Sequence, residues 1–102
     1  MTNLRELARG QDCTIRIPGV CNHNTATTVL AHYRLAGTCG TGIKPPDELG
    51  AWACSSCHDF VDGRINGGII TTEMMRIRWH AEGVMRTLYK LHQLGYEMRM
   101  KK

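Results

Sequence analysis

Cysteines and histidines are the residues of this 102-residue chain whose types and spacing best suit chemistry, and there are five of each. Four cysteines form two pairs, Cys13 with Cys21 and Cys54 with Cys57, and each pair flanks a predicted turn. Four thiolates in tetrahedral geometry hold a structural zinc ion, and its binding contributes folding free energy directly. We therefore predict a closed four-cysteine zinc site, although seven residues separate the first pair, which is wider than usual, and that pair could be incidental. Cys39 is left over, and we predict a buried small residue or a free thiol there.

Two histidines lie where predicted elements meet. His32 ends a predicted strand, and His58 directly follows the second cysteine pair at the start of a predicted helix. A path of strand, loop, strand and helix can bring both to one cleft. There, one imidazole could take a proton from water, and the other, one helical turn from Asp62, could hold a divalent ion against a phosphate. Taken singly, each histidine is more often structural. The other three are predicted in a solvated turn, at the border of an apolar helix face and near a helix end: His23, His80 and His92. From its border position His80 could approach the same cleft, but a packed or partly exposed histidine is favoured.

The first quarter of the chain is predicted to carry the first cysteine pair. Residues 2–9 have leucines at helical spacing and precede a glycine, which predicts a short helix. Residues 14–17 alternate like a strand, and Pro18 and Gly19 then form a tight turn. A tight turn brings its ends together, so the sulfurs of Cys13 and Cys21 can face one ion.

The middle of the chain is predicted to carry the histidines. A β-branched run predicts a strand over residues 26–32, and residues 35–49, rich in glycine and proline, predict a long ordered loop. A second strand is predicted over residues 49–53. A helix over residues 55–63 follows, capped by Ser55 or Ser56.

A long amphipathic helix is predicted at the end of the chain. It follows a turn at residues 66–68, begins at Thr71 or Thr72 and ends at Gly95. Apolar residues recur three and four positions apart, which predicts one face packed on the core. Its members are Met74, Ile77, Ala81, Val84, Leu88 and Leu91.

Length and composition predict one soluble, cytoplasmic domain over residues 1–102. No apolar run approaches a membrane span, and we expect no membrane partner. An odd number of cysteines in a reducing compartment favours metal ligation over disulfides. The net charge of +4 suits a polyanionic partner such as nucleic acid without establishing one.

These motifs resemble a known superfamily. Ala31-His32, the glycine-rich loop and Cys54-x-x-Cys57-His58 resemble the HNH branch of the ββα-metal (His-Me finger) nucleases in its zinc-stapled form. More closely, VLAHYRLAGTCGTGIKPPD and ACSSCHD resemble the small prophage-encoded nucleases of the YbcO type, relatives of the RecA-dependent nuclease Ref.

The resemblance implies an α+β fold, a zinc-stapled ββα-metal core with a short N-terminal and a long C-terminal helix. It implies a metal-dependent DNA endonuclease with His32 as general base and His58 as a ligand of a catalytic Mg²⁺ or Mn²⁺. The chain departs from the pattern at Ala31, where many HNH enzymes have an acidic ligand, and at Leu49, where an asparagine is expected.

Two aspartates could compensate for these departures. We predict Asp62 as the second ligand of the catalytic ion and Asp47 as an orienting group or a ligand. Candidate phosphate contacts are Arg34, Lys44, Arg64, Arg76 and Arg86. The alternative is a non-catalytic zinc module that binds DNA or a recombination protein. A third hypothesis, from the similarity to Ref, is an enzyme that acts only with RecA filaments.

Overall fold

The short N-terminal helix is the first element of the computed structural model, which describes residues 3–63 and 73–96. Helix α1 spans Leu4–Ala8, slightly less than the predicted 2–9. The Asn3 side chain caps it by accepting hydrogen bonds from the amides of Arg5 at 3.1 Å and Glu6 at 3.3 Å. Gly10 then turns the chain with a φ of 81°. The predicted helix is therefore confirmed.

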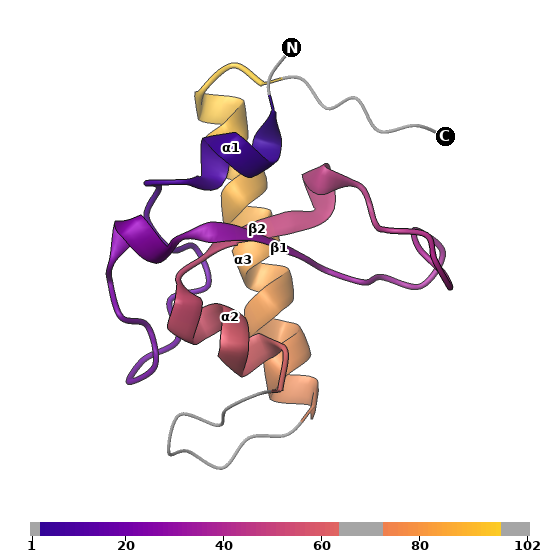
Figure 1. Ribbon diagram of the computed structural model, residues 1–102, viewed down its shortest axis with the longest axis horizontal. Helices are drawn as coiled ribbons and strands as arrows, with labels where there is room; N and C mark the ends of the chain where they lie inside the picture. Colours follow the sequence, from indigo (N-terminus) through magenta and orange to yellow (C-terminus); the bar gives the residue numbers. More distant parts are fainter. Residues whose placement is uncertain (1–2, 64–72, 97–102) are drawn as a thin grey trace.

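A two-stranded antiparallel sheet crosses the middle of the molecule (Figure 1). Strand β1 spans Val29–His32 and strand β2 spans Gly50–Ala53, with Ala31 opposite Ala51 and His32 opposite Gly50. All four residues of β2 are buried, whereas β1 keeps partly exposed positions. The sheet therefore places His32 at its rim, at the start of the long loop that joins the strands.

Two helices complete the architecture. Helix α2, Ser55–Val61, follows β2 after one residue, and helix α3, Glu73–Gln93, runs behind the sheet and crosses the direction of its strands (Figure 1). Two short 3₁₀ turns, Thr25–Thr27 and Asp47–Leu49, precede the strands. The predicted small α+β fold is confirmed. Within residues 3–63 and 73–96, no helix has both the length and the apolarity needed to cross a membrane.

Helix α3 approaches β2 closely because Gly83 faces the sheet. A Cβ atom at Gly83 would lie 2.7 Å from Cγ1 of Ile15 and 3.1 Å from Cβ of Ala51. One turn later, the hydroxyl of Thr87 accepts a hydrogen bond from the amide of Trp52 at 3.1 Å. A helix side chain thus satisfies a buried amide at the outer edge of the sheet, as burial demands.

The predicted apolar face of α3 is partly wrong. Met74 is 75% exposed and Ile77 is 41% exposed, whereas polar and small residues occupy much of the buried face. The reason is that close approach requires Gly83, and Thr87 is needed to satisfy the sheet edge; a pattern that counts only apolar residues misses both. The buried residues are His80, Gly83, Val84, Thr87 and Leu91.

Several predicted boundaries also differ. Residues 14–17 do not form a strand, because Arg16 adopts a left-handed φ of 56°, and only the amide of Thr14 pairs with Trp52, at 2.7 Å. The strand predicted over 26–32 is shorter, since residues 25–27 form a 3₁₀ turn capped by Asn24. The predicted turn at 66–68 and the start of the last helix at Thr71 or Thr72 lie outside the described residues.

Candidate metal centre and active site

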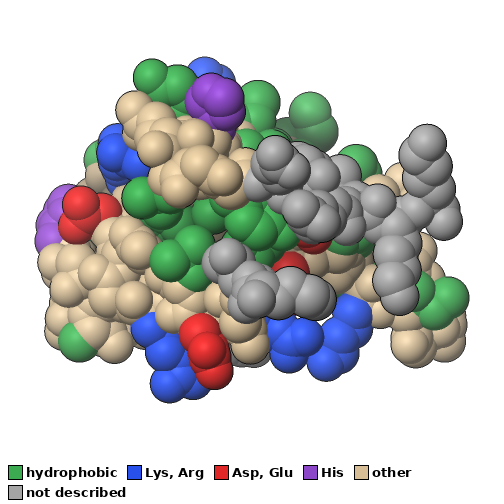
Figure 2. Space-filling model, turned by 90° about the horizontal axis from the view of Figure 1, so that it is seen from above, with side chains coloured by type: hydrophobic (Ala, Val, Ile, Leu, Met, Phe, Trp, Pro, Cys, Tyr) green, Lys and Arg blue, Asp and Glu red, His purple; other side chains and the backbone are tan. Residues whose placement is uncertain are grey.

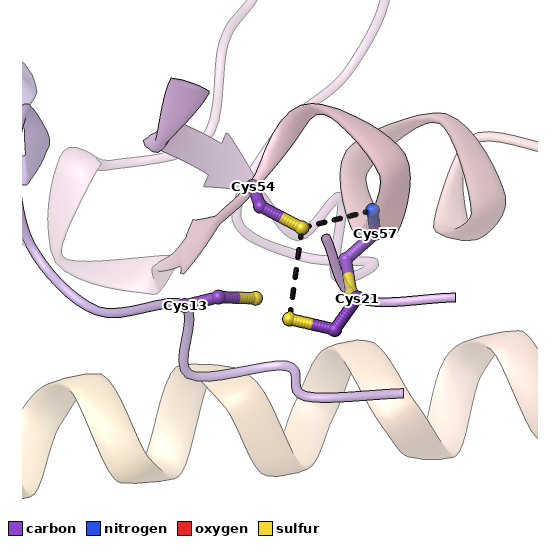
Figure 3. Close-up of side chains that lie close together, drawn as sticks. All are labelled: Cys13, Cys21, Cys54 and Cys57. Atoms are coloured by element: carbon purple, nitrogen blue, oxygen red, sulfur yellow. Dashed lines mark hydrogen bonds between the residues drawn. The ribbon is translucent and has the colours of Figure 1, made fainter. Parts of the chain in front are cut away.

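The four paired cysteines converge on one point, as Figure 3 shows. Their sulfur atoms all lie within 4.8 Å of one another, and the Sγ atoms of Cys21 and Cys54 are 3.8 Å apart. Tetrahedral coordination with zinc–sulfur bonds of about 2.3 Å places sulfur atoms about 3.8 Å apart. The group, Cys13, Cys21, Cys54 and Cys57, therefore fits a metal ion such as zinc in both donor type and spacing.

Both pairs orient their first sulfur with a backbone amide three residues later. The amide of Arg16 lies 3.5 Å from Cys13 Sγ, and the amide of Cys57 lies 3.4 Å from Cys54 Sγ. Cys54 is thereby the N-cap of α2, in place of the predicted Ser55 or Ser56. Such amide contacts hold ligating atoms in position and stabilise charge on sulfur. Arg16, whose amide makes the first of these contacts, has a left-handed backbone, which is uncommon for a residue with a Cβ.

Burial makes this cluster a poor place for free thiolates. Cys54 and Cys57 are fully buried and Cys13 is 8% exposed. The hydrogen bond with Cys57 lowers the pKa of Cys13 to about 4, while the same bond and burial raise the pKa of Cys57 far above its ordinary value. Burial raises the pKa of Cys21 to about 11. Four negative charges can coexist here when a divalent cation compensates them.

The fifth cysteine lies apart from this cluster. Cys39 is half-buried in the loop between the strands, and its Sγ lies 3.7 Å from the carbonyl oxygen of Leu35. His23 is exposed in a turn, as predicted, with Nδ1 3.8 Å from Cys21 Sγ. His92 is exposed near the end of α3.

His32 and Asp47 meet at the rim of the sheet. His32 Nε2 and Asp47 Oδ1 are 2.6 Å apart, and both side chains are roughly one-quarter exposed, at 25% and 30%. Arg5 Nε lies 3.4 Å from the other carboxylate oxygen. Burial acts to raise the pKa of Asp47, but the hydrogen bond with His32 and the charge of Arg5 outweigh it, so this pKa lies below its ordinary value. Asp47 is therefore an anion that holds one ring nitrogen of His32.

His58 and Asp62 form a second pair, one turn apart on α2. His58 Nε2 lies 3.3 Å from Asp62 Oδ2, and about one-third of each side chain is exposed. The predicted shared face is therefore present. Among the described residues, the only group of three or more potential ligands with converging atoms is the cysteine cluster. Asp47 thus pairs with His32 and does not join His58 and Asp62 as a third preformed ligand.

The sequence favours a packed or partly exposed His80, while allowing that it could approach the site. It is a buried residue of α3, and its charge would interact with Asp62, His58 and His32. Burial lowers the pKa of His80, an effect that the nearby histidines strengthen and Asp62 opposes. A single histidine within the apolar face of an amphipathic helix is the sequence feature that could have indicated a role for His80.

The candidate phosphate contacts differ in their surroundings. Arg34 and Lys44 are exposed on the loop between the strands, and Arg34 donates a hydrogen bond to the carbonyl of Gly40 at 3.2 Å. Arg76 is half-buried beside the end of α2, its Nε 3.9 Å from where a Cβ at Gly63 would lie. Arg64 lies outside the described residues.

Arg86 has partners inside the protein. Its guanidinium donates to the carbonyl of Thr14 at 2.6 Å and pairs with Glu82 at 3.1 Å. It therefore joins α3 to the loop that carries Cys13, while about one-third of its side chain remains exposed. On the face seen in Figure 2, Lys and Arg side chains are spread around the margin with Asp and Glu between them, so basic charge is dispersed among the described residues there.

Comparisons with known proteins agree with this architecture. The chain is 61% identical over 64 residues to "Putative nuclease YbcO" of Escherichia coli (strain K12), covering 63% of this chain and 67% of that protein. The same identity and coverage hold for "Putative nuclease ybcO" of Enterobacteria phage 82. A solved structure described as "Structure of a putative bacteriophage protein from Escherichia coli str. K-12 substr. MG1655" superposes with a TM-score of 0.73. It is 40% identical, and the match covers 89% of this chain and 98% of that one.

The family match spans nearly the whole chain. Residues 2–96 match the family described as "Putative nuclease YbcO". That range includes both cysteine pairs, His32 with Asp47, and the histidine–aspartate pair of α2. The chain therefore belongs to the family described as "Putative nuclease YbcO".

Proposed function

We propose that this protein is a metal-dependent DNA endonuclease of the HNH, or ββα-metal, type, with His32 as its general base. The family description supports hydrolysis of nucleic acid, and the order of β1, β2 and α2 agrees with the strand, strand, helix path of that superfamily. The four-cysteine cluster would hold zinc as a structural ion that joins the loop before β1 to the start of α2.

The observation that carries the proposal is the short hydrogen bond between His32 and Asp47. A carboxylate only accepts hydrogen bonds, so the bond of 2.6 Å requires the proton on Nε2 of the neutral ring. The other nitrogen, Nδ1, then carries a lone pair, and no hydrogen-bond partner for it exists among the described residues. An oriented imidazole with a free lone pair at a partly exposed rim is suited to take a proton from an attacking water.

His58 and Asp62 are the proposed ligands of the catalytic ion. They supply one imidazole nitrogen and one carboxylate, from side chains that are 31% and 35% exposed, which leaves room for a phosphate oxygen and water. Mg²⁺ is usually held by one or two carboxylates with several waters, while an imidazole suits Mn²⁺ and related ions. A divalent ion there would stabilise negative charge on the scissile phosphate.

Basic side chains that are exposed or partly exposed would position the DNA. Arg34 and Lys44 flank the loop that leaves His32 and returns to Asp47, and Arg76 lies beside the end of α2. Contacts to phosphates orient a duplex without reading its bases. We therefore propose cleavage with little sequence preference.

Plasmid nicking with Mg²⁺ or Mn²⁺ tests this function. Wild type is expected to nick supercoiled DNA, and His32→Ala is expected to lose about 10²- to 10⁴-fold in rate, the usual contribution of a general base. His92→Ala, which removes an exposed histidine of α3, is the matched control and should be unchanged. The reactions are repeated on single-stranded DNA coated with RecA filaments, because the resemblance to Ref allows a partner-dependent enzyme.

Two results would contradict the proposal. Full activity in His32→Ala would show that another group activates water. Silence of wild type under every condition, with zinc bound, would favour a non-catalytic zinc module that binds DNA or a recombination protein.

A further inference from the structure

His80 reaches from α3 to the strand that carries His32. Its side chain is buried, at 9% exposure, and its Nε2 lies 2.9 Å from the carbonyl oxygen of Ala31. A carbonyl oxygen only accepts, so Nε2 carries the proton and donates it. The lowered pKa of His80 keeps the ring neutral, with that single N–H directed at the strand.

The same ring also contacts the residue after His32. The rings of His80 and Tyr33 have centroids 5.1 Å apart and are inclined at 47°. His80 therefore holds Ala31 and Tyr33, the two neighbours of His32 in the chain. A ring that contacts the backbone of Ala31 and the side chain of Tyr33 restrains the chain on both sides of His32, and side chains in a strand stand in directions set by the backbone.

This hold matters because β1 is short and ends at His32. Each strand of the sheet has four residues, and beyond His32 the pairing continues only with the amide of Tyr33, which donates to the carbonyl of Leu49 at 2.9 Å. A two-stranded sheet is marginal without packing partners. Fraying of its end would move His32 away from Asp47.

We propose that His80 is a positioning residue for the reaction: through its hydrogen bond to Ala31 and its ring contact with Tyr33, it holds the His32 imidazole against Asp47. The inference rests on the proposed role of His32 as general base. His80 does not touch substrate in this assignment, and its effect is transmitted through the backbone of β1.

Substitutions that keep or remove the donor test this role. His80→Gln places an amide N–H the same number of bonds from Cα, whereas His80→Leu removes the donor and keeps an apolar side chain. His92→Leu, on the exposed side of the same helix, is the matched control. Each protein is examined with zinc bound and well below its Tm, so that a folded population is measured.

The expected kinetic result is a split between kcat and KM. His80→Leu should lower kcat about 10- to 100-fold, since misplacement by about 1 Å can cost that much, with KM changed less than about 2-fold. His80→Gln should recover most of the loss, and His92→Leu should match wild type. Equal losses in the Gln and Leu variants, or an unchanged kcat in His80→Leu, would overturn the inference.

A second readout does not depend on activity. Nitrogen-15 NMR of the His32 ring is expected to report one tautomer, protonated on Nε2, in wild type and His80→Gln, and a mixture in His80→Leu. The same single tautomer in all three would overturn the inference even if wild type proved inactive. Should His80→Leu fail to fold, Tyr33→Leu removes only the ring contact, and an unchanged kcat and tautomer there would count equally against it.

Discussion

Loss of one cysteine of the proposed zinc site is expected to destabilise the whole domain. Structural zinc sites contribute about 10 to 16 kcal/mol of apparent binding free energy, so one of four thiolates accounts for about 3 to 4 kcal/mol. A domain of this size is stable by about 5 to 15 kcal/mol in total. Cys13→Ser should therefore remove a large fraction of the stability, because the loop that it anchors also carries Ile15 and Ile17, both fully buried in the core.

Thermal unfolding with metal analysis measures this effect. One kcal/mol corresponds to about 4 to 8 °C in Tm for a small domain, so Cys13→Ser should lower Tm by roughly 12 °C or more. Wild type should release one zinc per chain on treatment with a thiol-modifying reagent. In the native, zinc-loaded protein only Cys39 is expected to react quickly, whereas all five cysteines should react after unfolding with a chelator.

Cys39→Ser is the matched control, since this cysteine lies outside the cluster. It should keep the wild-type zinc content and a Tm within a few degrees of wild type. The reasoning would be refuted if Cys13→Ser and Cys39→Ser had the same Tm, or if chelation left the circular dichroism and Tm of wild type unchanged.

Two further predictions concern packing and charge. Gly83→Ala should lower the free energy of unfolding, measured in urea, by about 1 to 2 kcal/mol. The new Cβ would lie 2.7 Å from Ile15, and this overpacking outweighs a gain in helix propensity of about 1 kcal/mol. A variant more stable than wild type would contradict the close approach of α3. Asp47→Asn should cost about 1 kcal/mol at neutral pH. Because the folded pKa of Asp47 is lowered, its contribution is fully present above the ordinary value of 3.8 and is lost as pH falls through the folded pKa. The difference between variant and wild type should therefore narrow in urea titrations carried out below that value, and a difference that persists in the most acidic titrations would contradict an ionised Asp47 in the folded protein.

Features that depend on neighbours within one turn could be predicted from the sequence. The short helix near the N-terminus, the turn at Pro18 and Gly19, and the shared face of His58 and Asp62 all follow from local spacing. The convergence of the cysteine pairs was also predicted, because each pair closes its own turn. Residue type then determines the chemistry: buried sulfur donors fit a metal ion such as zinc.

Features that depend on how distant segments pack could not be predicted from the sequence. The strand predicted over residues 14–17 does not form, because Arg16 has a left-handed backbone and its amide contacts the Cys13 sulfur. Arg86, chosen as a surface cation, donates inward to a backbone carbonyl. Alternation and charge describe a segment in isolation, whereas packing against α3 decides which groups must be satisfied inside the protein.

The candidate active site shows the same division. Sequence motifs identified His32, but left Asp47 open between orienting group and metal ligand, and favoured a packed or partly exposed His80 over one that approaches the site. Asp47 is 15 residues from His32 and His80 lies 49 residues from Ala31, so their contacts arise only when the loop closes and α3 packs on the sheet. Residue types determined which chemistry is available to this protein. Tertiary contacts decided which carboxylate holds the histidine, because a hydrogen bond of about 3 Å between distant segments depends on strand register and helix position. No local sequence pattern specifies either of these.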